Sequence, residues 1–210
     1  MTNIETKHSE IKEYLWDTWK NSDRYRDFIV ELNNDEIEEA KKVAKSRNDA
    51  ARDAKSKNPR LSNSPSFGYE RDILGALGEM AAIKWFRDNG YNPSIEAFID
   101  TEVRGKDDTF DTDFVFDGEK ISVEIKTTTK PVKAKLIYPL HKGRRRTQPD
   151  VFVLVSQIDE SRYCIKGFAD KDTMLKNVDD TLPKKAYAIR ENKLKKDLQN
   201  TLKTNIINNK

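Results

Sequence analysis

The stretch DTDFVFDGEKISVEIKTT, residues 111–128, constrains the fold more than any other part of the chain. Apolar and polar residues alternate on both sides of Asp117-Gly118, and this dipeptide favours a type I′ turn between two antiparallel strands. The sequence therefore predicts a β-hairpin. With a two-residue turn, Asp113 lies opposite Ser122 and Asp111 lies opposite Glu124.

The charged residues of this hairpin fall on one face. Side chains alternate along a strand, so Glu124 and Lys126 point the same way and are roughly 7 Å apart. Asp111 and Asp113 share that face through the pairing. Carboxylates this close repel each other unless a cation or solvent separates them, and a hard divalent ion such as Mg²⁺ prefers oxygen ligands. A solvated polar face is the alternative.

A further acidic residue comes from the segment before the hairpin. Residues 66–90 have the pattern of a helix closed by Gly90, and Glu79 lies within it. The helical neighbours of Glu79 are small or apolar: Gly75, Ala76, Ala82, Ile83 and Phe86. Burying an unpaired carboxylate costs several kcal/mol, so Glu79 needs a partner unless it reaches water at the edge of this face. Gly75 and Gly78 suit a helix whose backbone approaches a sheet closely.

The remaining segments predict an α/β or α+β fold, with a central mixed sheet flanked by helices. We expect strands at 95–99, 150–158, 162–169 and 185–190, a short helix at 170–177 and an amphipathic helix at 191–202. Residues 1–60 are interpreted as a helical N-terminal extension, residues 61–200 as the main domain and residues 201–210 as a polar tail.

Within the N-terminal extension, three helices are expected. Ile11, Tyr14, Leu15 and Trp19 form one helical stripe, and Phe28 to Leu32 suggest a second, short helix. Asn34 is placed as the cap of a third helix, which is poor in large apolar residues and is expected to pack weakly.

Composition limits the class of protein. No apolar run is long enough to span a membrane, the N-terminus lacks the pattern of a signal peptide, and Cys164 is the only cysteine. We therefore expect a cytoplasmic protein. Two histidines and one cysteine do not make a zinc site, and no P-loop or dinucleotide-binding motif is present.

The net charge of +3 hides a marked asymmetry. Residues 61–119 carry 13 acidic and 5 basic side chains, whereas residues 120–149 carry nine basic and one acidic. The basic block contains Lys130, Lys133, Lys135, Lys142, Arg144, Arg145 and Arg146. A loop this basic suits the backbone of a nucleic acid, with a solvated loop as the alternative. Tyr138 and His141 are interpreted first as ordinary packing or loop residues.

GALGEMAAIKWF followed by DFVFDGEKISVEIKTT resembles the PD-(D/E)XK nuclease superfamily, named for an aspartate followed by Glu-x-Lys on a hairpin. The later segments PDVFVLVSQIDESRYCIKGFADKDTM and KAYAIRENKL are similar to the last strands of small phage and prokaryotic members. The resemblance covers residues 66–198 and implies a restriction-endonuclease-like core. Thr112 stands where the family name has proline, and Asp111 competes with Asp113 for the family aspartate. We favour Asp113, because an aspartate followed by three apolar residues matches the pattern better.

The resemblance implies roles for these residues. Asp113, Glu124 and the backbone carbonyl of Ile125 would bind Mg²⁺, with Mn²⁺ as a substitute, and Glu79 would bind the same ion through water or a second ion. Lys126 would orient or activate the attacking water and steady the charge on the scissile phosphate.

The expected function is that of a Mg²⁺-dependent endonuclease acting on DNA, with RNA also open, in a bacterial or phage-infected cell. A homodimer through the helical N-terminal region is compatible with this function, because one site cuts one strand. Two alternatives remain: a nucleic-acid-binding module without catalysis, and an interaction protein whose basic loop binds an acidic partner.

Overall fold

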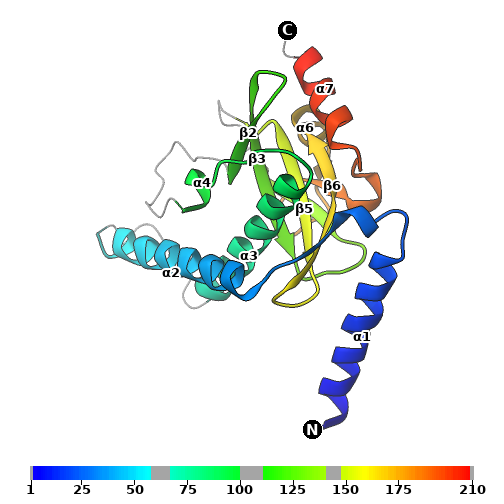
Figure 1. Cartoon of the computed structure of the whole chain (residues 1–210). Helices are drawn as coiled ribbons and strands as arrows, with labels where there is room; N and C mark the ends of the chain where they lie inside the picture. Colours follow the sequence, from blue (N-terminus) through cyan, green and yellow to red (C-terminus); the bar gives the residue numbers. More distant parts are fainter. Residues whose placement is uncertain (1, 58–66, 100–110, 141–147, 209–210) are drawn as a thin grey trace.

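The computed structural model describes residues 2–57, 67–99, 111–140 and 148–208 and shows an α+β fold (Figure 1). The α-helices are α1 (Thr2–Lys20), α2 (Asn34–Lys57), α3 (Phe67–Asp88), α4 (Glu96–Ile99), α6 (Lys171–Lys176) and α7 (Leu198–Asn208), with 3₁₀ turns η1 (Arg26–Phe28) and η3 (Glu191–Lys193). The strands are β1 (Ile29–Glu31), β2 (Thr112–Phe116), β3 (Glu119–Thr128), β4 (Lys135–Pro139), β5 (Val151–Gln157), β6 (Arg162–Asp170), β7 (Val178–Asp179) and β8 (Ala186–Arg190).

The central sheet has five strands in the order β1-β6-β5-β3-β2. β3 and β5 run parallel, while the other neighbouring pairs are antiparallel, so the sheet is mixed as predicted. A second sheet, in the order β4-β8-β7, is wholly antiparallel.

β5 separates the two halves of the core. Val151, Val153 and Val155 belong to the cluster formed with α3, whereas Phe152 and Leu154 belong to the cluster formed with β4, β8 and α6. The unbroken apolar run of β5 is therefore buried on both faces, as its sequence predicts. The central sheet lies between α3 on one side and the second sheet on the other.

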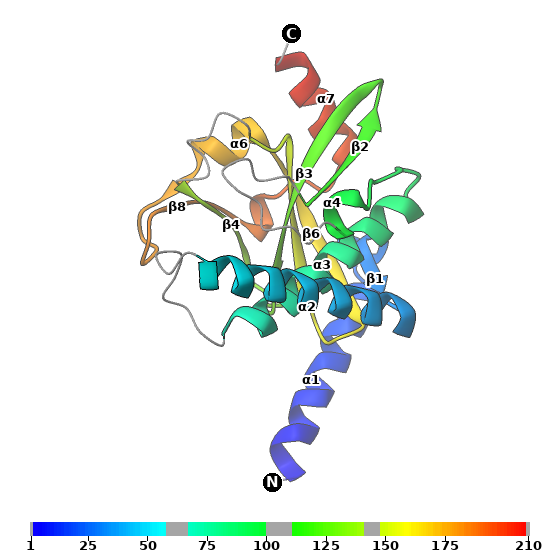
Figure 2. The same ribbon diagram turned by 90° about the vertical axis from the view of Figure 1, so that its left-hand side faces the viewer.

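The predicted hairpin is confirmed with its register. Thr112 pairs with Val123, Asp113 with Ser122 and Phe116 with Glu119. Asp117 and Gly118 both have positive φ, at 50° and 81°, which is the requirement of a type I′ turn. The tip of this hairpin extends beyond the rest of the sheet (Figure 2).

α2 is part of the main core rather than a loosely attached helix. Ile37, Ala40, Val43 and Ala44 are buried in the same cluster as α3, and the prediction of weak packing is wrong. The small side chains let the two helices approach closely, which compensates for the lack of bulk. Since β1 also pairs with β6, residues 29–57 are continuous with the predicted domain that starts at residue 61.

The start of α2 shows a reciprocal cap. The Asn33 side chain accepts a hydrogen bond from the Glu36 backbone N–H at 2.9 Å, and the Glu36 carboxylate accepts one from the Asn33 N–H at 2.8 Å. This is the capping-box arrangement, with Asn33 rather than the predicted Asn34 as the capping residue. Gly90, with φ of 82°, closes α3 as predicted.

α1 is attached through its C-terminal half. Trp16 and Trp19 are buried, but Ile11 and Tyr14 are 56% and 71% exposed, so the predicted apolar stripe is only partly used. The N-terminal turns extend away from the body (Figure 1), out of reach of the core.

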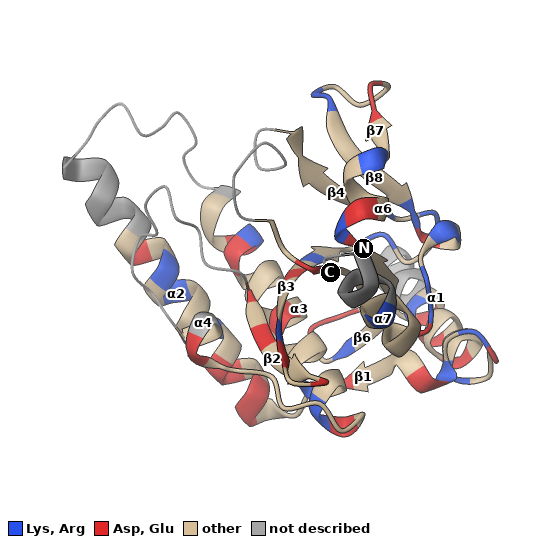
Figure 3. Ribbon diagram, turned by 90° about the horizontal axis from the view of Figure 1, so that it is seen from above, with Lys and Arg blue, Asp and Glu red and all other residues tan. Residues whose placement is uncertain are grey.

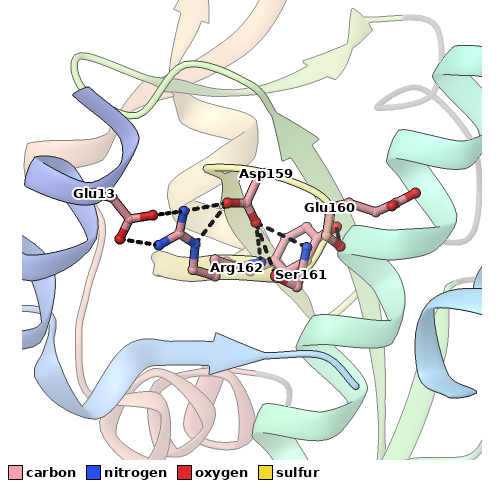
Figure 4. Close-up of polar contacts among 6 residues, drawn as sticks. Glu13, Asp159, Glu160, Ser161 and Arg162 are labelled. Carbon is pink, nitrogen blue, oxygen red and sulfur yellow. Dashed lines mark hydrogen bonds and ion pairs between the residues drawn. The ribbon is translucent and has the colours of Figure 1, made fainter. Parts of the chain in front are cut away.

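An ion-pair network fixes α1 to the turn between β5 and β6 (Figure 4). Arg162 lies 2.8 Å from Glu13 and 2.6 Å from Asp159, and its guanidinium is 5.7 Å from the centre of the Trp16 ring. One arginine thus joins a helix carboxylate, a turn carboxylate and an aromatic face.

Three predicted elements are wrong. Residues 95–99 form a helical turn, α4, rather than a strand, and the Ser94 hydroxyl accepts the Glu96 N–H at 3.3 Å at its start. The predicted short helix near Phe28 is a 3₁₀ turn followed by β1, because Ile29 and Val30 pair with β6. The predicted C-terminal helix begins only at Leu198, after the turn η3.

The segment expected to be wholly a basic loop contains β4. Ala134, Leu136 and Tyr138 are buried, while Lys133 and Ile137 are exposed.

None of the described helices combines the length and apolarity needed to cross a membrane.

Candidate functional site

The site lies where β3 extends past the end of its pairing with β2. β2 pairs with β3 only as far as Thr112 and Val123, whereas β3 continues to Thr128. Asp111 immediately precedes β2, and its Oδ2 accepts the backbone N–H of Ile125 at 2.6 Å. A carboxylate therefore takes the place of a backbone carbonyl in the ladder, and this fixes Asp111 against the edge of β3.

α3 brings Glu79 to the same edge. An added Cβ on Gly78 would lie 1.9 Å from Thr127 Oγ1 and 2.7 Å from Thr127 Cβ, so only glycine permits this approach of α3 to β3. The next residue is Glu79, which is only 7% exposed. The close packing predicted from the glycines of this helix is confirmed at Gly78.

Arg47 of α2 is the direct partner of Glu79. Its Nη1 lies 3.0 Å from Glu79 Oε1 and 2.8 Å from Oε2, and its Nη2 donates to the Phe98 carbonyl at 2.8 Å. Only Oε1 accepts a hydrogen bond with good geometry, and the buried Oε2 of Glu79 has none. The carboxylate is thus charge-paired but not saturated with hydrogen bonds.

Glu124 and Lys126 pair with each other on β3. Lys126 Nζ donates to Glu124 Oε1 at 2.5 Å and to the Ile125 carbonyl at 3.3 Å. Glu124 is 5% exposed, and Lys126 is more open, with 31% of its side chain exposed. The two residues share one face of the strand, as their spacing predicts.

Electrostatics unite these residues into one cluster. Burial and the charge of Asp111 raise the pKa of Glu79 to about 8, against the opposing effects of Arg47 and Lys126. Burial and the charge of Glu124 likewise raise the pKa of Asp111. Burial disfavours the charge on Lys126, but Asp111 and Glu124 outweigh it and raise the lysine pKa above its usual range.

The elements that carry the cluster lie near the middle of the molecule. Figure 3 shows α3 and β3 between α2 on one side and β4, β7 and β8 on the other. Helix α3 and the hairpin therefore meet here, and the charged residues that they carry lie close enough to affect one another's pKa values.

The structure brings together Glu79, Asp111, Glu124 and Lys126, but it places Asp113 differently. The Asp113 side chain is 28% exposed and pairs with Lys120 Nζ at 3.0 Å. The charges with the largest effect on Glu79 and Lys126 include that of Asp111. The geometry favours Asp111 as the aspartate of this site, because it lies opposite Glu124 at the strand edge.

The predicted nucleic-acid contacts are only partly described. Lys130 and Lys133 are exposed beyond the end of β3, and Lys135 pairs with Asp179 at 2.8 Å. The other four predicted contacts, Lys142, Arg144, Arg145 and Arg146, lie outside the described residues, as does His141. Tyr138 is buried against Phe152, with ring centres 4.8 Å apart, and is a core residue.

Arg47 is the site residue that sequence reasoning missed. A signal was present, because Ala40, Val43 and Ala44 lie seven, four and three residues before Arg47 and so share its face of the helix. A lone arginine on a buried face requires an acidic partner.

In the described part of the chain, no three His, Cys, Asp or Glu side chains form a ready-made metal site. Two carboxylates face cations of the protein instead: Glu79 faces Arg47, and Glu124 faces Lys126. The arrangement can hold a cation of small radius, orient water or neutralise an anionic substrate, because its donors are oxygens and its cations are fixed.

Comparison of the chain with protein-family models, with curated proteins and with solved structures gives no match.

Proposed function

We propose that this chain is a Mg²⁺-dependent endonuclease of the PD-(D/E)XK type, with a restriction-endonuclease-like core, that hydrolyses phosphodiester bonds of DNA. The observation that carries the proposal is the convergence of Glu79, Asp111, Glu124 and Lys126 at the edge of β3. Buried carboxylates around one ammonium are costly for folding, so their grouping favours a functional role over a structural one.

The residues of the site fit a hard divalent cation. Every available donor is an oxygen, and Glu79 keeps a buried Oε2 without a hydrogen bond. Asp111, Glu124 and the carbonyl of Ile125 would hold the ion, and Glu79 would bind it directly or through water. When bound, Mg²⁺ supplies a water of lowered pKa and neutralises charge on the phosphate.

Lys126 has a defined task in this proposal. Its raised pKa keeps it protonated at neutral pH, so it donates hydrogen bonds and carries positive charge rather than accepting a proton. Its side chain is 31% exposed, whereas Glu124 is almost fully enclosed. Lys126 is therefore suited to orient the attacking water and to stabilise the charge that grows on the scissile phosphate.

The surface beyond β3 supports a polyanionic substrate. Exposed Lys130 and Lys133 follow the catalytic strand directly, and the arginine-rich segment 144–146 continues the same block. Contacts of this kind bind phosphates, so they give affinity and salt dependence with little base selectivity.

Incubation of supercoiled plasmid with Mg²⁺ or with EDTA tests the proposal. We expect nicked and linear DNA only with Mg²⁺, and a loss of at least about a hundredfold in rate for Glu124→Gln and for Lys126→Met. Glu119→Gln is the matched control, because Glu119 lies exposed on the same strand. DNA binding without cutting would favour the non-catalytic binding module, and neither binding nor cutting would favour the interaction protein.

A further inference from the structure

Arg47 is held from three directions inside the site. Its guanidinium contacts both oxygens of Glu79, donates to the Phe98 carbonyl at 2.8 Å, and lies 5.5 Å from the centre of the Phe98 ring. Only 23% of its side chain is exposed. Arg47 thus links α2 to α3 and α4, and its position is fixed by hydrogen bonds and by an aromatic face.

The charge balance of the cluster depends on this residue. Glu79, Asp111 and Glu124 supply three carboxylates, and Arg47 and Lys126 supply two positive charges. Lys126 is engaged by Glu124, so Arg47 is the cation nearest to Glu79. An arginine cannot lose its charge to relieve crowding, in contrast to a lysine.

A divalent cation would neutralise the charge of Glu79, as the guanidinium of Arg47 does in the ion pair. A guanidinium and a divalent ion on the same buried carboxylate repel each other strongly, because little water separates them. The unsaturated Oε2 of Glu79 is a free ligand position, but it lies 2.8 Å from Arg47 Nη1. Occupancy by the ion and full engagement of Arg47 therefore exclude each other.

We propose that Arg47 is an internal counter-ion that competes with the divalent cation for Glu79. The inference rests on the proposed function of the carboxylate cluster. When Glu79 is ionised and no cation is bound, Arg47 neutralises it and links α2 to α3 and α4. When the cation binds, Glu79 is withdrawn from Arg47, and the affinity for the cation is lower than the carboxylates alone would give. Arg47 is a positioning residue in this scheme.

Calorimetric titration of Mg²⁺, without nucleic acid, tests the competition. We compare wild type, Arg47→Gln and Arg47→Lys at several pH values up to 9 and take the affinity from the range where it no longer changes with pH, because losing Arg47 raises the pKa of Glu79 and lets a proton compete with the ion. Arg47→Gln is expected to bind Mg²⁺ at least tenfold more tightly than wild type, which corresponds to about 1.4 kcal/mol. Arg47→Lys is expected to fall between wild type and Arg47→Gln, because a lysine carries the charge but, unlike an arginine, can lose it.

Lys84→Gln is the matched control. Lys84 pairs with Glu36 at 2.8 Å and joins the same two helices, α2 and α3, with a similar exposed fraction of 27%. Its removal is expected to leave Mg²⁺ affinity within twofold of wild type. An affinity of Arg47→Gln equal to or weaker than that of wild type overturns the competition.

A measurement on wild-type protein keeps the test decisive if Arg47→Gln does not fold. The ¹⁵N resonances of the Arg47 guanidinium are expected to shift when Mg²⁺ is added, and unchanged resonances at saturation overturn the inference.

The experiments distinguish failure of the competition from failure of the nuclease proposal. A wild type that cuts DNA and binds Mg²⁺, with unchanged affinity in Arg47→Gln, contradicts only the competition, whereas a wild type that neither binds Mg²⁺ nor cuts contradicts the nuclease itself.

Discussion

Asp111 Oδ2 accepts the backbone N–H of Ile125 at 2.6 Å, one residue before β2 begins and beside the part of β3 that extends past β2. The contact fixes an aspartate beside Glu124 and Lys126, the two residues that flank Ile125. Asp113, two positions later, points to the same side but pairs with Lys120 at 3.0 Å. Two residues along the strand thus separate the aspartate beside Glu124 from the aspartate that pairs with Lys120.

The first prediction contrasts these two residues by the same chemical change. Asp111→Asn is expected to lower plasmid cleavage by at least about a hundredfold, because it removes a carboxylate from the cluster. Asp113→Asn is expected to keep activity within a few-fold of wild type. Asparagine at 111 still accepts the Ile125 N–H, so thermal unfolding should show that both variants fold. Loss of activity in Asp113→Asn alone would reverse the assignment.

A second prediction concerns the approach of α3 to β3. Gly78→Ala is expected to lower the free energy of unfolding by about 1–3 kcal/mol, because its Cβ would meet Thr127 Oγ1 at 1.9 Å. This loss exceeds the gain of about 1 kcal/mol in helix propensity. Urea unfolding measures the change.

Gly75→Ala serves as the comparison on the same helix. The nearest atom to a Cβ at Gly75 is Glu79 Oε1 at 4.0 Å, an ordinary contact. Here the helix propensity acts alone, and the variant is expected to be stabilised by up to about 1 kcal/mol. Equal effects of the two substitutions would show that α3 does not depend on the contact with Thr127.

The hairpin was predictable because its determinants are local. Asp117-Gly118 fixes the turn, the turn fixes the register, and the register places Asp111 opposite Glu124 before any tertiary contact is known. The preference for Asp113 came from a family pattern rather than from this register. The register instead favours Asp111, the residue opposite Glu124.

Elements that depend on distant partners were harder to predict. Ile29 and Val30 form a strand only because β6 lies beside them, and β4 was hidden because lysines alternate with its buried residues. The partnership of Arg47 and Glu79 spans 32 positions and two helices, so the local pattern that places Arg47 on a buried face does not identify its partner. Sequence reasoning therefore located the acids of the site but not the cation that neutralises one of them.

A third prediction follows from the pKa of Glu79, which burial raises from its ordinary 4.5 to about 8. Between these values the folded state holds a proton that the unfolded state has lost, so this group lowers stability as the pH rises. Glu79→Gln lacks this titration. The stability of Glu79→Gln relative to wild type is therefore expected to increase between pH 5 and pH 8.5.

The expected increase exceeds about 1.4 kcal/mol, the equivalent of one pKa unit. Urea unfolding of both proteins at each pH, in EDTA, provides the measurement. Arg47 stays charged throughout this range, so losing its partner shifts the difference by a constant and does not change its slope. A difference that is flat or falls with pH would mean that Glu79 is already ionised at pH 5.

The fourth prediction concerns Lys196, which lies against the rings of Tyr25 and Phe28. Its Nζ is 4.1 Å from the centre of the Tyr25 ring and 4.6 Å from that of Phe28, and it donates to the Ile165 carbonyl at 3.3 Å. The rings favour the charged form. Burial disfavours it more strongly and, together with the charges of Arg24 and Lys166, lowers the pKa of Lys196 to about 7.

The sign of the pH effect is opposite to that of Glu79. Between about 7 and its ordinary 10.5, Lys196 is protonated in the unfolded state and neutral in the folded state, so stability contributed by this group rises with pH. Lys196→Met is therefore expected to be more stable than wild type at pH 6, with an advantage that shrinks by more than about 1.4 kcal/mol by pH 9.5. Exposed Lys193→Met is the control for the loss of a lysine outside this buried position. If Lys196→Met instead destabilises the protein equally at both pH values, the ring contacts outweigh burial and the lysine is charged in the folded state.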